Sequence, residues 1–141
     1  MNQVGEFKAR LAQAQASVAN QELAAMLVIP GASLRYLTGY DAILLERLTC
    51  LVVRGDDVAP ILIVPALERA AAVASGVKDL GIEIVDWQET DDPYGLIAQV
   101  LPSDGTIAID NHMWAETAMR LRLAMPGLTH TLAGPIIEAL R

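Results

Sequence analysis

The chain has 141 residues, of which 53% are hydrophobic and 19% charged, so it has the size of one domain with a substantial core and excludes disorder. Its formal net charge of −7 argues against nucleic-acid binding, which needs a clustered basic surface. The one cysteine, Cys50, excludes an internal disulfide framework and, inside an apolar run, predicts a buried thiol.

The sequence also indicates where the protein resides. The amino-terminal stretch MNQVGEFKAR has no apolar signal core, and a lone cysteine suits a reducing compartment. The longest charge-free stretch, 123–137, is broken by glycine and proline and predicts no membrane-spanning helix. We therefore expect a cytoplasmic protein with no membrane contact.

The first segment has the spacing of an amphipathic helix. Its apolar residues recur every three or four positions, which predicts a helix from about Gln3 to Ala19. The apolar run LAAMLVI, 23–29, suits a strand covered on both faces. After it, we expect Ser33 to cap a short helix that ends at Gly39.

A hairpin is predicted next. The apolar runs 48–53 and 59–64 are joined by a short connection that contains the turn 54–57, so the two strands should be antiparallel. An Ala-rich helix over 67–75 should follow and close at Gly76.

The second half alternates strands and helices. Asp92 and Pro93 have the residue types of a helix cap and a first helical position. The expected elements are a strand over 82–87, a helix over 93–101, a strand over 106–110, a helix over 114–125, a strand over 128–132 and a helix over 135–141.

This element order predicts the fold class. An early hairpin followed by strand–helix units gives an α/β fold with a mixed, mostly parallel sheet flanked by helices. We expect a single domain spanning 1–141.

A search for chemistry yields little. The two histidines, His112 and His130, lie in different elements, and no paired cysteines or metal-binding motif occur. We expect His112 in a solvated loop and His130 facing solvent on a strand. Asp110 lies at the carboxyl end of the predicted strand 106–110, where α/β proteins bind ligands, but capping the next helix is the more frequent role for such a residue.

The adjacent acidic pairs have structural explanations. Asp56 and Asp57 belong to the hairpin turn, and Asp91 and Asp92 precede a helix. No phosphate-binding glycine loop or nucleophile elbow is present. The residues therefore predict neither a catalytic nor a metal-binding site within this chain.

Two phrases, SLRYLTGY and the later LTCLVVRGDDVAPILIVPALERAAA, resemble one family. They are similar to the amino-terminal domain of the creatinase, prolidase and aminopeptidase P class of pita-bread metallopeptidases. The phrases GTIAIDNHMWA and LAGPIIEALR are also similar to it, so the resemblance covers nearly the whole chain. It implies a three-layer, ribonuclease H-like architecture.

The resemblance also implies a function. The family's catalytic domain follows this one and holds two divalent metals (Mn, Co or Zn), which activate water for hydrolysis of proline-containing short peptides. On this basis the chain is the non-catalytic amino-terminal domain of an Xaa-Pro peptidase, lacking the carboxyl-terminal catalytic domain. Its expected roles are shaping substrate access and supporting subunit association, with a homodimer as the expected assembly.

The resemblance makes the loop after Gly39 the natural place for these roles. The candidate residues for substrate access or a subunit interface are Tyr36, Tyr40, Asp41, Trp87 and His112. For Tyr36 and Tyr40, the structural alternatives are core packing with a satisfied hydroxyl and a packed loop anchor.

Three other interpretations stay open. The chain could be a free-standing oligomerisation or ligand-binding domain of the same fold. It could belong to a creatinase-like amidinohydrolase, which shares the two-domain plan but cleaves a non-peptide C–N bond without metals. It could also be a small-molecule or receiver-like domain that uses Asp110.

Overall fold

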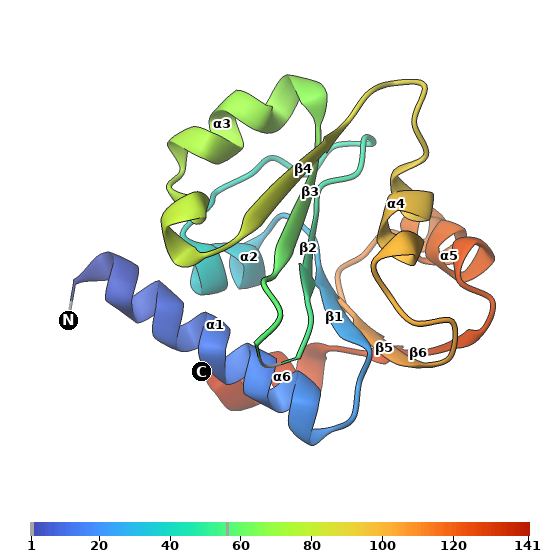
Figure 1. The fold of residues 1–141 in the computed structure, drawn as a ribbon, viewed down its shortest axis with the longest axis horizontal. Coiled ribbons are helices and arrows are strands. Elements are labelled where there is room, and N and C mark those ends of the chain that lie inside the picture. Colours follow the sequence, from blue (N-terminus) through green and yellow to red (C-terminus); the bar gives the residue numbers. More distant parts are fainter. Residues whose placement is uncertain (1, 56) are drawn as a thin grey trace.

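The computed structural model describes residues 2–55 and 57–141, and within them the strands form one six-stranded sheet (Figure 1). The strand order is β4-β3-β2-β1-β5-β6. The strands are β1 Ala25–Val28, β2 Cys50–Val53, β3 Ile61–Pro65, β4 Glu83–Trp87, β5 Gly105–Ile109 and β6 Leu128–Leu132. Strand β2 is antiparallel to both β1 and β3, whereas β1–β5, β3–β4 and β5–β6 are parallel. The expected mixed, mostly parallel sheet with an early hairpin is confirmed.

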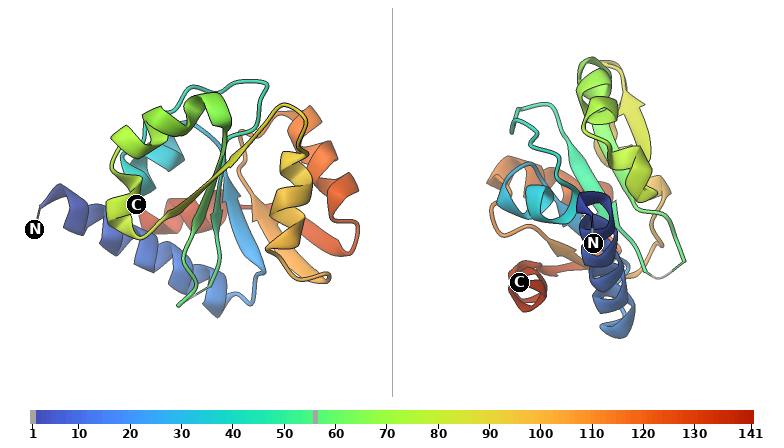
Figure 2. Two further views of the ribbon diagram at one scale, coloured as in Figure 1. Left: turned by 45° about the horizontal axis from the view of Figure 1, so that its top comes forward. Right: turned by 90° about the vertical axis from the view of Figure 1, so that its left-hand side faces the viewer.

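Helices cover both faces of this sheet (Figure 2). The helices are α1 Gln3–Asn20, α2 Ala32–Thr38, α3 Arg69–Ala74, α4 Pro93–Gln99, α5 Ala115–Ala124 and α6 Gly134–Leu140, with 3₁₀ turns η1 Ala66–Glu68 and η2 Val77–Leu80. Residues of α1, α2, α3 and α6 share one core cluster, and residues of α4 and α5 share the other. The sheet is therefore the middle of three layers.

Strand β1 explains the uninterrupted apolar run that predicted it. Successive side chains of a strand point to opposite faces, so Met26 and Val28 join one core while Ala25 and Leu27 join the other. All four residues are completely buried. A central strand with helices on both sides has no solvent-facing position.

The expected cap at Ser33 is wrong. Helix α2 begins at Ala32, its N-cap is Gly31, and no side chain caps it. Gly31 has a φ of 148°, which lets the chain turn from β1 into the helix two residues earlier than a cap at Ser33 would require. The other end is as expected, because Gly39 adopts the left-handed conformation with a φ of 76°.

Two further segments differ from expectation. The single helix expected over 67–75 is the 3₁₀ turn η1 followed by α3, and Gly76 then turns with a φ of 89°. The turn η2 between Gly76 and Gly81 was not expected, because four residues are too few to show a helical periodicity; both flanking glycines are left-handed. Asp56 of the hairpin turn lies outside the described residues.

Asp92 caps α4 as expected, since its side chain accepts a hydrogen bond from the Tyr94 nitrogen at 3.1 Å. Within residues 2–55 and 57–141, no helix combines the length and apolar character needed to cross a membrane.

Candidate functional site

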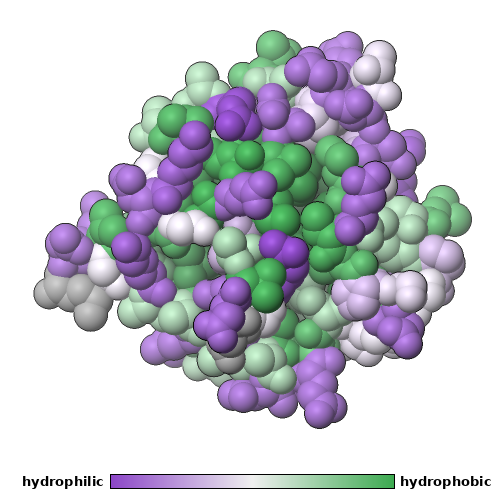
Figure 3. Space-filling model, in the orientation of Figure 1, coloured by the Kyte–Doolittle hydropathy of each residue, from purple (hydrophilic) through white to green (hydrophobic). Residues whose placement is uncertain are grey.

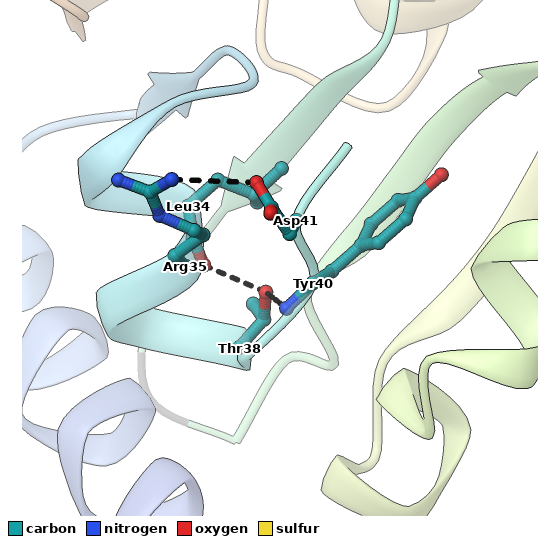
Figure 4. Close-up of polar contacts among 5 residues, drawn as sticks. All are labelled: Leu34, Arg35, Thr38, Tyr40 and Asp41. Carbon is teal, nitrogen blue, oxygen red and sulfur yellow. Dashed lines mark hydrogen bonds and ion pairs between the residues drawn. The ribbon is translucent and has the colours of Figure 1, made fainter. Parts of the chain in front are cut away.

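The phrase Tyr-Leu-Thr-Gly-Tyr forms a tight exit from α2 (Figure 4). The Thr38 hydroxyl donates to the Leu34 carbonyl at 2.7 Å and accepts from the Tyr40 nitrogen at 3.0 Å. The Gly39 nitrogen donates to the Arg35 carbonyl at 2.8 Å. Threonine and glycine are therefore needed here to satisfy the end of the helix and to reverse the chain.

Tyr40 lies inside the molecule. It is 5% exposed and belongs to the core between the sheet and helices α1, α2, α3 and α6. Burial, and secondarily the negative charge of Glu68, raises the pKa of the Tyr40 phenol above its ordinary value. Its ring points away from the Arg35–Asp41 pair (Figure 4), so Tyr40 anchors the loop that follows.

Asp41 is exposed. Its carboxylate lies 3.4 Å from the Arg35 guanidinium, and the two side chains are 75% and 53% exposed. An ion pair this open to solvent contributes between about 0 and 1 kcal/mol. Asp41 is thus accessible to a partner, but little in its surroundings holds it in one position.

Tyr36 points in a different direction from Tyr40. Its hydroxyl donates to the Leu140 carbonyl of α6 at 2.9 Å, and the Arg10 guanidinium of α1 lies 4.2 Å from the centre of its ring. Tyr36 therefore contacts the helical layer and is separated from the loop that Tyr40 anchors. Its hydroxyl is satisfied, as the structural alternative predicted.

Trp87 ends β4 and lines a small pocket. Its indole nitrogen donates to the Leu48 carbonyl at 2.9 Å, and the residue is 8% exposed. The pocket has a volume of about 160 Å³, and its wall is completed by Arg47, Pro65, Ala66, Leu67, Gln88 and Glu89. Arg47 forms an ion pair with Glu89, which joins the loop before β2 to the loop after β4.

Four large apolar side chains near this pocket are exposed. One lies on the pocket wall, and the other three shortly precede the wall residue Arg47 in sequence. Leu67 is 78% exposed, and in the loop before β2 Ile43 is 74%, Leu44 37% and Leu45 39% exposed. We call these four residues the apolar rim. In the space-filling view, hydrophobic atoms reach the surface over the upper middle of the visible face (Figure 3). Three consecutive aliphatic residues outside any periodic segment were the sequence signal for this rim, and sequence reasoning missed it.

His112 is exposed, as expected, and lies in a second pocket of about 140 Å³. The other residues lining it are Ser33, Asp110, Asn111, Gly134, Ile137, Glu138 and Arg141. Strand order separates β4 from β5 by four strand spacings, or about 19 Å. The structure therefore places Trp87 and His112 in two separate pockets.

Asp110 is 5% exposed and lies where connections from neighbouring strands diverge. Its carboxylate accepts from the Ile29 nitrogen at 3.3 Å and the His112 nitrogen at 2.9 Å. The expectation that it caps the following helix is wrong, because α5 has Trp114 as its N-cap and no side-chain cap. Asp110 instead joins the end of β1 to the loop after β5.

Cys50 and His130 each have a reactive atom that is shielded from solvent. Cys50 is completely buried, and burial, followed by the Asp110 charge, raises the pKa of its thiol to about 12. His130 is half-buried, and its expected solvent-facing position is wrong because the Nε2 atom is inaccessible. Burial, followed by the Arg122 charge, lowers the pKa of His130.

The described residues also do not fit a two-metal centre. Nowhere among residues 2–55 and 57–141 do three His, Cys, Asp or Glu side chains come together as a metal site requires. The side chains of these residues therefore provide no ligand set for such a centre.

Comparison with known proteins identifies the family. Residues 10–141 match the family model described as the creatinase/prolidase N-terminal domain, so the chain belongs to that family. It is 38% identical over 136 residues to "Probable dipeptidase PepE" of Mycobacterium tuberculosis, covering 96% of this chain but only 36% of that protein.

Solved structures agree with the sheet described above. Dipeptidase PepE from Mycobacterium ulcerans is similar with a TM-score of 0.91 and 35% identity, over 99% of this chain and 38% of that one. The creatinase/prolidase N-terminal domain of an Xaa-Pro dipeptidase from Streptococcus pyogenes shares the fold with a TM-score of 0.77 at 24% identity, over 94% of this chain and 98% of that one. The chain thus spans little more than a third of its curated relatives.

Proposed function

We propose that this chain is the amino-terminal domain of a cytoplasmic dipeptidase that hydrolyses Xaa-Pro peptides. In this proposal the domain performs no chemistry, but shapes substrate access and supports association into a homodimer. The observation that carries it is the 38% identity to a dipeptidase across 96% of the chain.

The part of the relatives that this chain does not cover supports a division of roles between two domains. Their additional length is where the proposal places a carboxyl-terminal catalytic domain with two divalent metals, Mn, Co or Zn. Such metals would generate hydroxide and polarise the peptide carbonyl. A domain without a metal-ligand cluster among its described residues would then act by contact with that catalytic domain.

The apolar rim is the surface best suited to such contact. Leu67 and Ile43 expose most of their side chains, and the pocket beside Leu67 is lined by Trp87 and by the paired charges of Arg47 and Glu89. Leu67 lies on the wall of this pocket, and the other three rim residues are close in sequence to the wall residue Arg47. Exposed aliphatic side chains of this kind are typical of protein–protein or substrate contacts. Asp41 and Trp87 flank this surface in our proposal, whereas Tyr40 supports it from inside.

An activity assay tests whether the domain is catalytic by itself, and the gene sequence tests whether a catalytic domain follows it. The isolated chain should not hydrolyse Xaa-Pro dipeptides with added Mn²⁺ or Co²⁺. Turnover that EDTA abolishes would show that the domain is catalytic by itself. Reading the gene beyond the Arg141 codon should reveal the two Asp, one His and two Glu ligands; replacement of these ligands would instead favour a creatinase-like enzyme.

A matched pair of substitutions tests the access role in the longer gene product. Leu67→Ser should change KM or the preference for peptide length while leaving metal affinity unchanged. Leu123→Ser is the control, because Leu123 on α5 is 80% exposed and Leu67 is 78% exposed. Equal kinetics for both variants across a series of peptide lengths would remove the access role from the rim.

A further inference from the structure

Tyr36 joins three helices that are distant in sequence. It lies on α2, its hydroxyl donates to Leu140 at the end of α6, and its ring lies beneath the Arg10 guanidinium of α1. The Arg10 Nη1 also donates to the Tyr36 carbonyl at 2.9 Å. Arg141 adds a second cation, 5.2 Å from the ring centre.

Each contact has a physical reason at this place. The last carbonyls of a helix have no partner within the helix, and the Tyr36 hydroxyl satisfies that of Leu140. A guanidinium over a phenol ring is attracted by the negative face of the ring. Since Tyr36 and Leu140 are only partly buried against the core, these contacts act at its margin.

The rest of α6 is attached differently. Ile136 and Ile137 are 5% and 8% exposed and dock the first part of the helix into the core. The last turn, where the Arg141 nitrogen bonds to the Glu138 carbonyl at 3.3 Å, depends on fewer buried contacts. Helices α1 and α6 contact each other, and the carboxyl end of the chain lies close to α1 (Figures 1 and 2).

We propose that Tyr36 is a positioning residue: with Arg10 and Arg141 it forms a latch that holds the last turn of α6 and sets the direction in which the chain leaves the domain. The family's domain is amino-terminal, so in its longer members this exit leads to the remainder of the protein. The consequence for the placement of a catalytic domain rests on the proposed function. The latch itself involves only residues of this chain and does not rest on the proposed function.

Hydrogen exchange on the chain itself tests the latch. Tyr36→Phe keeps the ring and removes only the hydroxyl, so amides at 138–141 should exchange about fivefold faster, the factor equivalent to about 1 kcal/mol. Amides of β1 and β5 should not change. Tyr94→Phe is the matched control, because it removes the same hydroxyl from a tyrosine that packs with the opposite core.

A distance measurement adds a readout that a merely stabilising role would not move. Spin labels are placed on Lys8→Cys, an exposed site on α1, and on a cysteine appended after Arg141; the native Cys50 is buried. The distance distribution should be narrow in this background and should broaden with Tyr36→Phe but not with Tyr94→Phe. Arg10→Lys, which loses the planar group over the ring, should broaden it as well.

Unchanged exchange at 138–141 together with an unchanged distance distribution in Tyr36→Phe and Arg10→Lys would overturn the latch. Uniformly faster exchange throughout the chain would also overturn it, since Tyr36 would then support the whole core. These outcomes are independent of hydrolysis assays, so failure of the latch and failure of the proposed dipeptidase role are distinguishable.

Discussion

The indole nitrogen of Trp87 donates a hydrogen bond to the Leu48 carbonyl at 2.9 Å, joining the end of β4 to a residue 39 positions earlier. Leu48 is 5% exposed and lies three positions after Leu45, in the loop that carries three of the four residues of the apolar rim. One buried hydrogen bond thus sets the position of the loop relative to the pocket.

Trp87→Phe should therefore destabilise the domain by about 2 kcal/mol. The substitution leaves the buried Leu48 carbonyl without its partner, and such a loss costs roughly 1–3 kcal/mol. Trp114→Phe is the control, because Trp114 is 45% exposed and should change stability by less than about 0.5 kcal/mol. Urea denaturation measures both, and equal midpoints for the two variants would contradict the role given to this bond.

Gly39→Ala should be more destabilising than Gly81→Ala. Both glycines have a positive φ, 76° and 81°, so both substitutions pay a left-handed penalty of about 1 kcal/mol. A methyl group added at Gly39 would lie 2.8 Å from Cε2 of Phe7. A methyl group added at Gly81 would have no such neighbour within 4 Å.

We expect the difference between these two variants to be about 1 kcal/mol in the free energy of unfolding. Phe7→Ala should remove most of that difference, because the excess cost comes from the ring. A double-mutant cycle measures this coupling. If Gly39→Ala costs no more than Gly81→Ala with Phe7 in place, the ring moves aside freely.

Cys50 should make stability fall at alkaline pH. Its thiol has a pKa of about 12 in the folded protein against an ordinary 9, so the folded state retains the proton longer than the unfolded state. The stabilising contribution is complete below about pH 9 and is lost as pH rises towards 12, with a slope of up to about 1.4 kcal/mol per pH unit.

Comparison of the wild type with Cys50→Ala isolates this effect, because ionising tyrosines contribute equally to both. The wild type should lose more stability between pH 9 and 11 than the variant does. The native thiol should also be unreactive towards a disulfide reagent at pH 8 and react once urea unfolds the chain. Rapid labelling of the folded chain would place Cys50 outside the core.

Tyr40 should titrate above its ordinary pKa, and Glu68→Gln should lower that pKa part of the way back. Burial is the larger cause and remains in the variant, whereas the repulsion between the phenolate and the carboxylate disappears. Nuclear magnetic resonance of ring-labelled tyrosine measures the shift. Glu138→Gln on α6 is the control and should leave the Tyr40 resonance titrating as in the wild type.

Local patterns were sufficient to predict most elements. Residues 128–132 were predicted as a strand and form β6 with the same bounds, and the helix starting at Gln3 ends one residue beyond the expected Ala19. Gly39 and Asp92 were recognised as helix boundaries because their roles depend only on adjacent backbone. Ser33 was wrongly expected to cap the helix, because Gly31 with its unusual φ begins the helix earlier.

The arrangement of the site depends on distant pairings that local patterns do not contain. Trp87 is the last residue of β4 and His112 comes shortly after β5, yet β3, β2 and β1 lie between those two strands in the sheet. Tyr36 and Tyr40 are four positions apart, but one contacts α6 and the other is buried near Glu68. A left-handed glycine between them separates their directions, and only the packing of α1 and α6 determines what Tyr36 contacts.

The central position of β1 has a consequence for synthesis on the ribosome. Strands β1 to β4 come from residues 25–87 and can pair early, but the other side of β1 pairs with β5, where Leu27 is opposite Ile109. Until that later segment emerges, a nascent chain exposes an apolar, hydrogen-bonding edge that favours aggregation. We expect ribosome-stalled chains ending before residue 105 to bind chaperones more strongly than chains in which β5 has emerged; equal binding would show that β1 is protected before β5 arrives.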